Sequence, residues 1–195
     1  MPPRVLLALT TLCLLLAAGI GGVVLARAGG EDAPAPGWEG AIRPPGTRLP
    51  DFALRDQDGE LVTAAQLRGR PLVVTFVYST CEDVCPAQVM SIRGALDRLG
   101  RDVPVIGVSV DPANDTPRRA RAFLLEQSMT GRMRFLLGGA DQLARLWTAF
   151  GIAPQREGRE HSAYTVLVDA RGRQRIGFPA SQLTPSRLAH DLARL

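Results

Sequence analysis

Two cysteines, Cys81 and Cys85, stand at the junction between a predicted strand and a predicted helix. Residues 72–77 are an unbroken run of mostly apolar, β-branched residues, which is typical of a buried strand. Apolar side chains then recur at three- and four-residue steps, which predicts a helix over residues 86–99. Pro86 favours the first helical position and so makes Cys85 the predicted N-cap. Unpaired N–H groups and the helix dipole favour a thiolate there, the form that reacts and binds metals.

Strands and helices alternate after this junction, and a hairpin with a turn at Asp58-Gly59 precedes it. This order predicts an α/β fold with a mixed central sheet flanked by helices. A strand that leads into a helix with a cysteine pair at its start is the thioredoxin arrangement, so we expect a thioredoxin-like fold. The other predicted strands cover residues 103–110, 135–137, 164–168 and 173–178, and the other predicted helices begin at Pro117, near Leu143 and at Pro185.

An uncharged run over residues 5–26 lies between Arg4 and Arg27. About 20 apolar residues cross a bilayer core, so the run predicts one N-terminal transmembrane helix. Ala26-Arg27-Ala28 also resembles a signal-peptidase site, which leaves a cleaved signal peptide open. In both cases the remainder of the chain is exported.

The sequence divides into three parts on this basis. Residues 1–28 are the membrane anchor or signal segment, residues 29–48 a tether rich in Pro and Gly, and residues 49–195 the folded domain. Arg4 and the N-terminal amine favour a cytoplasmic N-terminus. We therefore expect a single-pass protein of the cell membrane, with its soluble domain on the extracytoplasmic side.

The net charge of +4 comes from arginines scattered among acidic residues, without interleaved aromatic residues. Nucleic-acid-binding proteins gather basic residues on one face, so the pattern predicts no nucleic-acid partner.

The cysteine pair has three intervening residues, whereas a thioredoxin-type redox pair has two. Two soft thiolates select soft metals, copper(I) above all, and copper also accepts imidazole. His161 lies in a polar loop before the strand at 164–168, and in a thioredoxin-like sheet that loop returns to the cysteine turn. His190 lies on the last helix and is expected at the surface. From the residues alone, metal binding and redox chemistry both remain open.

Four stretches of the sequence are similar to the Sco/SenC family of copper-binding thioredoxin-fold proteins. In that family two cysteines and a histidine bind copper, and the proteins help to assemble the dinuclear copper centre of cytochrome c oxidase subunit II. The resemblance implies copper as the bound metal, with Cys81, Cys85 and His161 as its ligands. The matching stretches are Leu49-Pro50-Asp51-Phe52, Tyr78-Ser79-Thr80-Cys81-Glu82-Asp83-Val84-Cys85-Pro86, Asp111-Pro112-Ala113-Asn114-Asp115-Thr116-Pro117 and His161-Ser162.

The sequence departs from the family pattern at two positions. Glu82 stands where the family commonly has proline, and Glu160 stands where an aspartate often precedes the histidine. Both changes keep the three ligands. The second alters the charge beside His161 and so the expected surroundings of the metal.

Two functions follow for the pair. The first is a copper metallochaperone for an oxidase subunit or a similar copper protein, which a thiol reductant would restore after a Cys81–Cys85 disulfide forms. The second is a membrane-tethered thiol–disulfide oxidoreductase in which Cys81 and Cys85 are the redox pair. A peroxiredoxin would need a hydroxyl where Glu82 stands, and the cysteine spacing is not that of a structural zinc site. Of the neighbouring residues, Asp111 and Asp115 are expected to close a turn, and Met90 and Trp147 to lie in the core.

Overall fold

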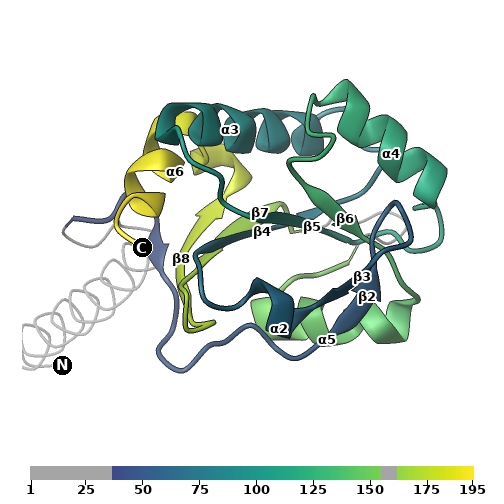
Figure 1. Cartoon of the computed structure of the whole chain (residues 1–195), viewed down its shortest axis with the longest axis horizontal. Helices are drawn as coiled ribbons and strands as arrows, with labels where there is room; N and C mark the ends of the chain where they lie inside the picture. The colour runs from purple at the N-terminus through teal and green to yellow at the C-terminus, as the bar shows by residue number, and fades with distance from the viewer. Residues whose placement is uncertain (1–36, 155–161) are drawn as a thin grey trace, which may run out of the picture. The chain divides into compact units, whose positions relative to one another are not determined.

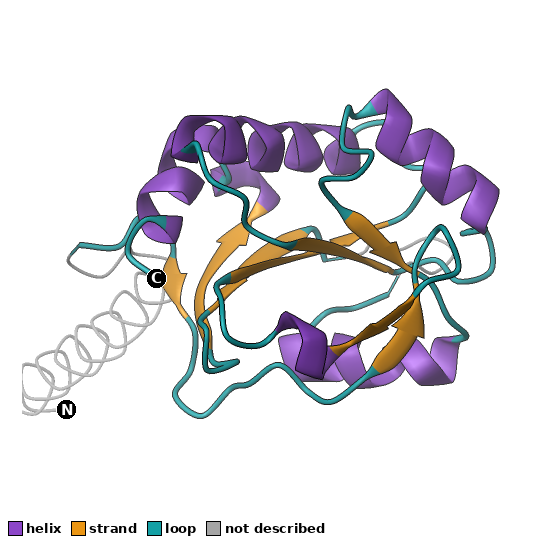
Figure 2. Cartoon of the chain, viewed as in Figure 1, coloured by secondary structure: helices purple, strands orange, loops and turns teal. Residues whose placement is uncertain are grey.

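The computed structural model describes residues 37–154 and 162–195. It shows a six-stranded mixed sheet with helices on both faces, together with a separate two-stranded hairpin (Figures 1 and 2). The sheet order is β1-β8-β7-β4-β5-β6. The strands are β1 (Ala41–Ile42), β4 (Leu72–Val77), β5 (Val105–Ser109), β6 (Arg134–Leu136), β7 (Tyr164–Val168) and β8 (Gln174–Pro179), with β2 (Ala53–Arg55) and β3 (Leu61–Thr63) in the hairpin.

The central strand β4 makes the sheet mixed, because it runs parallel to β5 and antiparallel to β7. All six of its residues are buried, as the apolar run predicts. Its side chains alternate between two cores: Val73 and Val77 pack in one, whereas Val74 and Phe76 pack in the other. The predicted mixed sheet is confirmed.

Helices cover both faces of the sheet (Figure 1). Residues of α3, α4 and α6 share the core that contains Val73, and residues of α2 and α5 share the core that contains Val74. The helices are α2 (Ala64–Leu67), α3 (Val84–Leu99), α4 (Pro117–Glu126), α5 (Ala140–Phe150) and α6 (Pro185–Leu192), with a short 3-10 turn at Ala180–Gln182.

Helix starts marked by a threonine followed by proline are confirmed. The Thr116 side chain accepts the N–H of Arg119 at the start of α4, and Thr184 accepts that of Arg187 at the start of α6. The proline in the next position has no N–H to leave unpaired.

The segment predicted as a tether is folded over its described part. Residues 41–42 form β1 and pair with β8, and Trp38 packs against the core beneath α3. The Asp191 carboxylate of α6 accepts the backbone N–H groups of Glu39 and Gly40, at 2.9 Å each for the shortest contacts. The sequence pattern did not predict this strand, because a two-residue edge strand has too few positions to show alternation.

In the described part of the chain, no helix has the length and apolar character needed to cross a membrane. The membrane span predicted over residues 5–26 lies outside the described residues, so it stays a prediction.

Candidate metal and redox site

Helix α3 begins at Val84, two residues earlier than predicted. Asp83 is the N-cap residue, and its side chain makes no capping hydrogen bond. The prediction of Cys85 as N-cap is therefore wrong. The error has a physical cause: the N–H groups of the whole first turn lack partners within the helix, so Pro86 is tolerated at the third position as well as the first.

The sulfur of Cys81 replaces the missing cap. Cys81 lies on the loop before the helix, and its Sγ accepts the backbone N–H of Cys85 at 3.2 Å. This N–H is one of the first-turn donors that the helix leaves unpaired. The positive end of the α3 dipole therefore acts on Cys81. The sequence pattern predicted that it would act on Cys85.

The two thiols consequently differ in acidity. Burial raises the pKa of Cys81, but hydrogen bonds from the thiol and the backbone N–H of Cys85 outweigh it, with help from the Asp83 backbone and the Tyr78 hydroxyl, and the net pKa is lowered. The pKa of Cys85 is raised strongly, first by burial and then by its hydrogen bond to Cys81. The loop cysteine is therefore the more acidic thiol of the pair, and the helix cysteine is the less acidic one.

Of the two cysteines at the start of α3, the loop cysteine is the more accessible. Cys81 is 9% exposed and lines a cavity of about 430 Å³, whereas Cys85 is 0% exposed and is not among the described residues that line it. Glu82 and Glu126 also line this cavity, and no basic residue is among its described lining. The surroundings suit a cation or a cationic partner better than an anion.

Asp115 fastens the cysteine turn to the sheet. One of its carboxylate oxygens accepts the backbone N–H and the hydroxyl of Ser79, at 2.7 and 2.6 Å, and the other accepts the hydroxyl of Ser109 at the end of β5. Burial raises the pKa of Asp115 despite these hydrogen bonds. The sequence predicted only a local turn here. Asp111 does close that turn, since its carbonyl accepts the N–H of Asn114, but Asp115 bridges two elements.

Gln88 is a residue of the site that the sequence reasoning missed. It lies one turn after Cys85 and is buried, and its Nε2 lies 2.9 Å from the Thr165 hydroxyl and 3.0 Å from the Tyr164 carbonyl. Its Oε1 is buried without a hydrogen-bond partner among the described residues. A polar residue on the buried face of a predicted helix was the available signal. Gln88 ties the cysteine helix to the strand that follows His161.

His161 itself lies outside the described residues, so its predicted position beside the sulfurs stays a prediction. Among the described residues, no group of three His, Cys, Asp or Glu side chains is placed to hold a metal ion. Of the three predicted ligands, the structure brings together the two cysteines. His190 is exposed on α6, with Nδ1 2.9 Å from an Asp191 oxygen, as expected for a surface residue.

Two neighbouring residues were predicted to lie in the core. Trp147 is buried and donates its Nε1–H to the Ser109 carbonyl at 2.9 Å, which confirms that prediction. Met90 is 52% exposed, so that prediction is wrong. It falls outside the buried stripe of α3, which contains Cys85, Val89 and Ile92.

Comparison with known proteins gives the family. The SCO1/SenC family model matches residues 42–195, which is most of the chain. The chain belongs to the SCO1/SenC family. The match begins at the strand β1, within the segment that the sequence had assigned to the tether.

Solved structures of SCO1/SenC proteins agree with the fold. ScoI of Bradyrhizobium japonicum, determined with copper bound, is 33% identical, with a TM-score of 0.62 over 74% of this chain and 97% of that one. A SCO1/SenC family lipoprotein of Bacillus anthracis is 23% identical, with a TM-score of 0.69 over 80% of this chain and 99% of that one. The expected thioredoxin-like α/β fold therefore matches that of solved Sco structures.

A curated relative is also similar, although over a shorter span. The SCO2-like protein of Rickettsia prowazekii is 26% identical over 134 residues, which cover 63% of this chain and 64% of that protein. The matched region thus spans just under two thirds of that relative.

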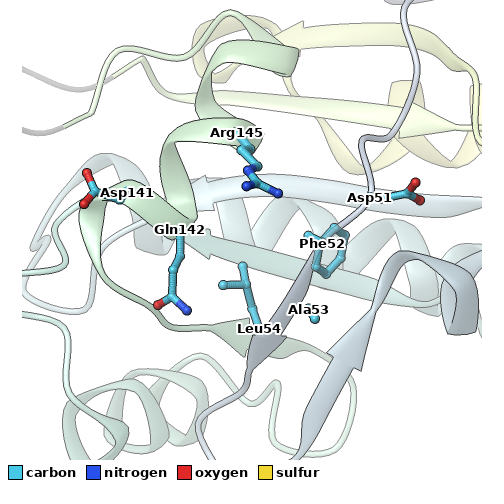
Figure 3. Close-up of a pocket in the computed structure, with 7 residues that line it drawn as sticks. All are labelled: Asp51, Phe52, Ala53, Leu54, Asp141, Gln142 and Arg145. Carbon is cyan, nitrogen blue, oxygen red and sulfur yellow. The ribbon is translucent and has the colours of Figure 1, made fainter.

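A second cavity, of about 370 Å³, lies away from the cysteines (Figure 3). Its lining comes from the segment around β2 and from α5, including Phe52, Leu54 and Arg145. Helix α5 packs in the core opposite that of α3, and no cysteine is among the described lining residues. None of its described lining residues is a soft donor of the kind that binds copper, and the cysteine turn stays the candidate site.

Proposed function

We propose that this protein holds one copper(I) ion through Cys81, Cys85 and His161 and passes it to the copper centre of a cytochrome c oxidase subunit II or a similar copper protein. The observation that carries the proposal is the pairing of the two cysteines at the start of α3, where the Cys81 sulfur accepts the Cys85 N–H and hydrogen bonds lower the pKa of Cys81. Copper(I) favours thiolate sulfur, and metal binding releases the remaining thiol proton. The copper-bound state of ScoI from Bradyrhizobium japonicum supports the same cargo here.

The third ligand would come from the loop that precedes β7. Copper(I) accepts two or three soft donors, and imidazole is a suitable third donor beside two sulfurs. The described chain resumes at Ser162 and enters β7 at Tyr164, whose carbonyl accepts from Gln88 one turn after Cys85. The residue just before Ser162 is therefore attached to an element that Gln88 holds against the cysteine helix, which supports His161 as the third ligand.

The location of the site belongs to the same proposal. The uncharged run over residues 5–26 would anchor the chain in the cell membrane and place the domain on the extracytoplasmic side. There the pair can oxidise to a disulfide that no longer loads metal, and a thiol reductant would restore it.

Copper(I) titration of the full chain in detergent, against a competing chelator, tests the proposal. We expect one copper(I) per chain, with affinity falling by at least about a hundredfold (~2.7 kcal/mol) in Cys81→Ser, Cys85→Ser and His161→Ala. His190→Ala is the matched control, because it removes the other histidine and should leave the affinity unchanged. Equal affinity in His161→Ala and His190→Ala would refute the ligand set.

A second function, thiol–disulfide exchange, is favoured by the contrast between the two cysteines. The accessible Cys81 has the lowered pKa of an attacking thiolate, and the buried Cys85 has the protonated state of a resolving thiol. Attack by Cys81 on a client disulfide would form a mixed disulfide and release one client thiolate. Attack by Cys85 would then close the Cys81–Cys85 disulfide and leave the client reduced by two electrons.

Trapping separates the two functions. If the protein is a reductase, Cys85→Ser should accumulate a mixed disulfide with a client peptide that contains a disulfide, and His161→Ala should reduce the client at the normal rate. A chaperone without this activity would give neither result.

A further inference from the structure

The turn between β7 and β8, the start of β8 and the residues after α6 line an arginine-rich cavity. It measures about 210 Å³, and its lining includes Trp38, Asp169, Arg171, Arg173, Arg175 and Arg194. Four arginines and one aspartate are thus among the residues that line this cavity. These arginines lie on other elements than the cysteine turn, so they are not part of the proposed copper site.

The tryptophan in this cavity is held firmly in place. The guanidinium carbons of Arg175 and Arg194 lie 6.0 and 5.9 Å from the centre of the Trp38 ring. Asp191 holds the next two backbone N–H groups, and a Cβ on Gly40 would come within 2.4 Å of Ile176. The chain after Trp38 is therefore packed tightly on β8, which fixes the ring between the two arginines.

The positive charge is only partly neutralised. Asp169 pairs with Arg173 and Arg175, at 2.8 and 3.4 Å. Arg171 and Arg194 are exposed and form no ion pair with any described residue.

Further arginines extend the charge along the turn between β7 and β8. The Arg48 guanidinium lies 3.5 Å from the Arg171 carbonyl, and the Arg68 side chain passes near Gly172. Arg68 is itself paired with Asp51 at 2.6 Å. We call Trp38, Arg48, Arg171, Arg173, Arg175 and Arg194 the basic face.

The basic face is also where the chain arrives from the predicted membrane span. Trp38 follows Arg27, the residue just after the apolar run, by eleven positions. A fully extended chain of that length reaches at most about 40 Å, and a flexible one typically about 20 Å. The basic face therefore stays within reach of the bilayer surface to which the chain would be anchored. Tryptophan and arginine are the residues that favour the headgroup region.

We propose that the basic face docks on the headgroups of anionic phospholipids. The inference rests on the membrane anchorage in the proposed function. The sheet sets the orientation of the docked domain. Leu72, at the start of β4, pairs with Val168, which lies just before the turn of the basic face. The cysteine turn follows Val77, at the other end of β4. Six residues of strand span about 20 Å. A docked domain would hold Cys81 away from the bilayer, open to a partner that projects from the membrane.

The test uses the full chain in lipid nanodiscs and reads the quenching of Trp38 fluorescence by brominated phosphatidylcholine. One set of discs contains phosphatidylglycerol as well, and the other contains only zwitterionic lipid. The protein has two tryptophans, and Trp147 is buried, so Trp38→Phe supplies the background signal. We expect quenching to be roughly twofold greater or more in the anionic discs and to fall as NaCl approaches about 1 M, where charges are screened beyond about 3 Å.

Charge reversal gives the decisive comparison. Arg171→Glu with Arg194→Glu should abolish the extra quenching, whereas Arg118→Glu with Arg145→Glu, exposed arginines on α4 and α5, should retain it. Equal quenching in both disc types, or full quenching in the Arg171/Arg194 variant, would overturn the inference, and failure of the chain to enter the discs would remove its basis. Copper(I) stoichiometry, measured on each variant, should not change. Absence of copper(I) binding in the wild-type chain would refute the copper function without changing the conclusion on lipid docking.

Discussion

The two ends of the central strand are built alike but differ in charge. At each end an aspartate fastens a turn: Asp115 holds the cysteine turn through Ser79, and Asp169 holds the turn of the basic face through the backbone N–H groups of Arg171 and Arg173, at 2.9 Å each. Asp115 is surrounded by neutral donors and by the nearby charge of Asp111. Asp169 has two guanidinium partners.

The pKa values of the two aspartates move in opposite directions as a result. Burial raises the pKa of both carboxyl groups, but at Asp169 the hydrogen bonds and the charge of Arg173 outweigh it, so its pKa is lowered. At Asp115 burial prevails and the pKa is raised. Negative charge is therefore uncompensated at the cysteine end, which suits the arrival of a cation. The opposite end carries excess positive charge, which suits an anionic surface.

The largest expected effect comes from removing the aspartate at the cysteine end. Asp115→Ala leaves the hydroxyls of Ser79 and Ser109 without their acceptor, which should lower the free energy of unfolding by about 3 kcal/mol. It also frees the cysteine turn from β5, so copper(I) affinity should fall as well. Urea unfolding and chelator competition measure the two quantities.

Asp169→Ala is the matched change at the other end. It should cost about 1–2 kcal/mol, because the freed N–H groups and arginines can turn to water. Copper(I) affinity should stay at the wild-type value. If both alanine variants weakened copper binding equally, the two ends would not be independent, and the comparison would fail.

A smaller effect is expected on the reactivity of the cysteine thiolate. Cys85→Ala removes the thiol whose hydrogen bond helps to lower the pKa of Cys81, so the pKa of Cys81 should rise. At neutral pH its alkylation by iodoacetamide should slow severalfold, because the thiolate is the reacting form. The pH–rate profile, followed by mass spectrometry of the labelled peptide, measures the shift.

The control for this prediction again comes from the opposite end. Arg171→Glu reverses a charge about 20 Å away, beyond the screening length of about 10 Å at 0.1 M salt, and should leave the Cys81 rate unchanged. Alkylation of Cys81 that does not slow in Cys85→Ala would show that the Cys85 thiol does not contribute to the acidity of Cys81.

The contrast between the ends also shows how far the sequence could predict the molecule. Periodicity predicted β4 over its full observed range, because a fully buried strand is an unbroken apolar run. Threonine followed by proline predicted the starts of α4 and α6 for a local reason, the capping hydrogen bond. These elements depend on neighbours in sequence, so local patterns are sufficient.

The roles at the site depend on neighbours in space. The Cys81 sulfur accepts an N–H four residues on, which helps to make Cys81 the more acidic cysteine, whereas the proline pattern assigned that role to Cys85. Gln88 and Asp115 join elements whose packing no local pattern reveals. The basic face likewise gathers Trp38 and Arg194 from the two ends of the described chain, so scattered charges in the sequence concealed a cluster. Residue types were predictable here, and their partners were not.

The smallest expected effect is a difference in pH dependence between the two aspartates. The lowered pKa of Asp169 means that its stabilisation is present above about pH 4, near the unfolded value, and is lost as pH falls through the folded value. The raised pKa of Asp115 has the opposite sign: its stabilisation is fully present below about pH 4 and is lost as pH rises through the folded value. Urea unfolding of the wild type, Asp169→Asn and Asp115→Asn between pH 3 and 7 measures both. The wild-type advantage over Asp169→Asn should grow with pH and that over Asp115→Asn should shrink, so two slopes of the same sign would show that the ends share one electrostatic environment.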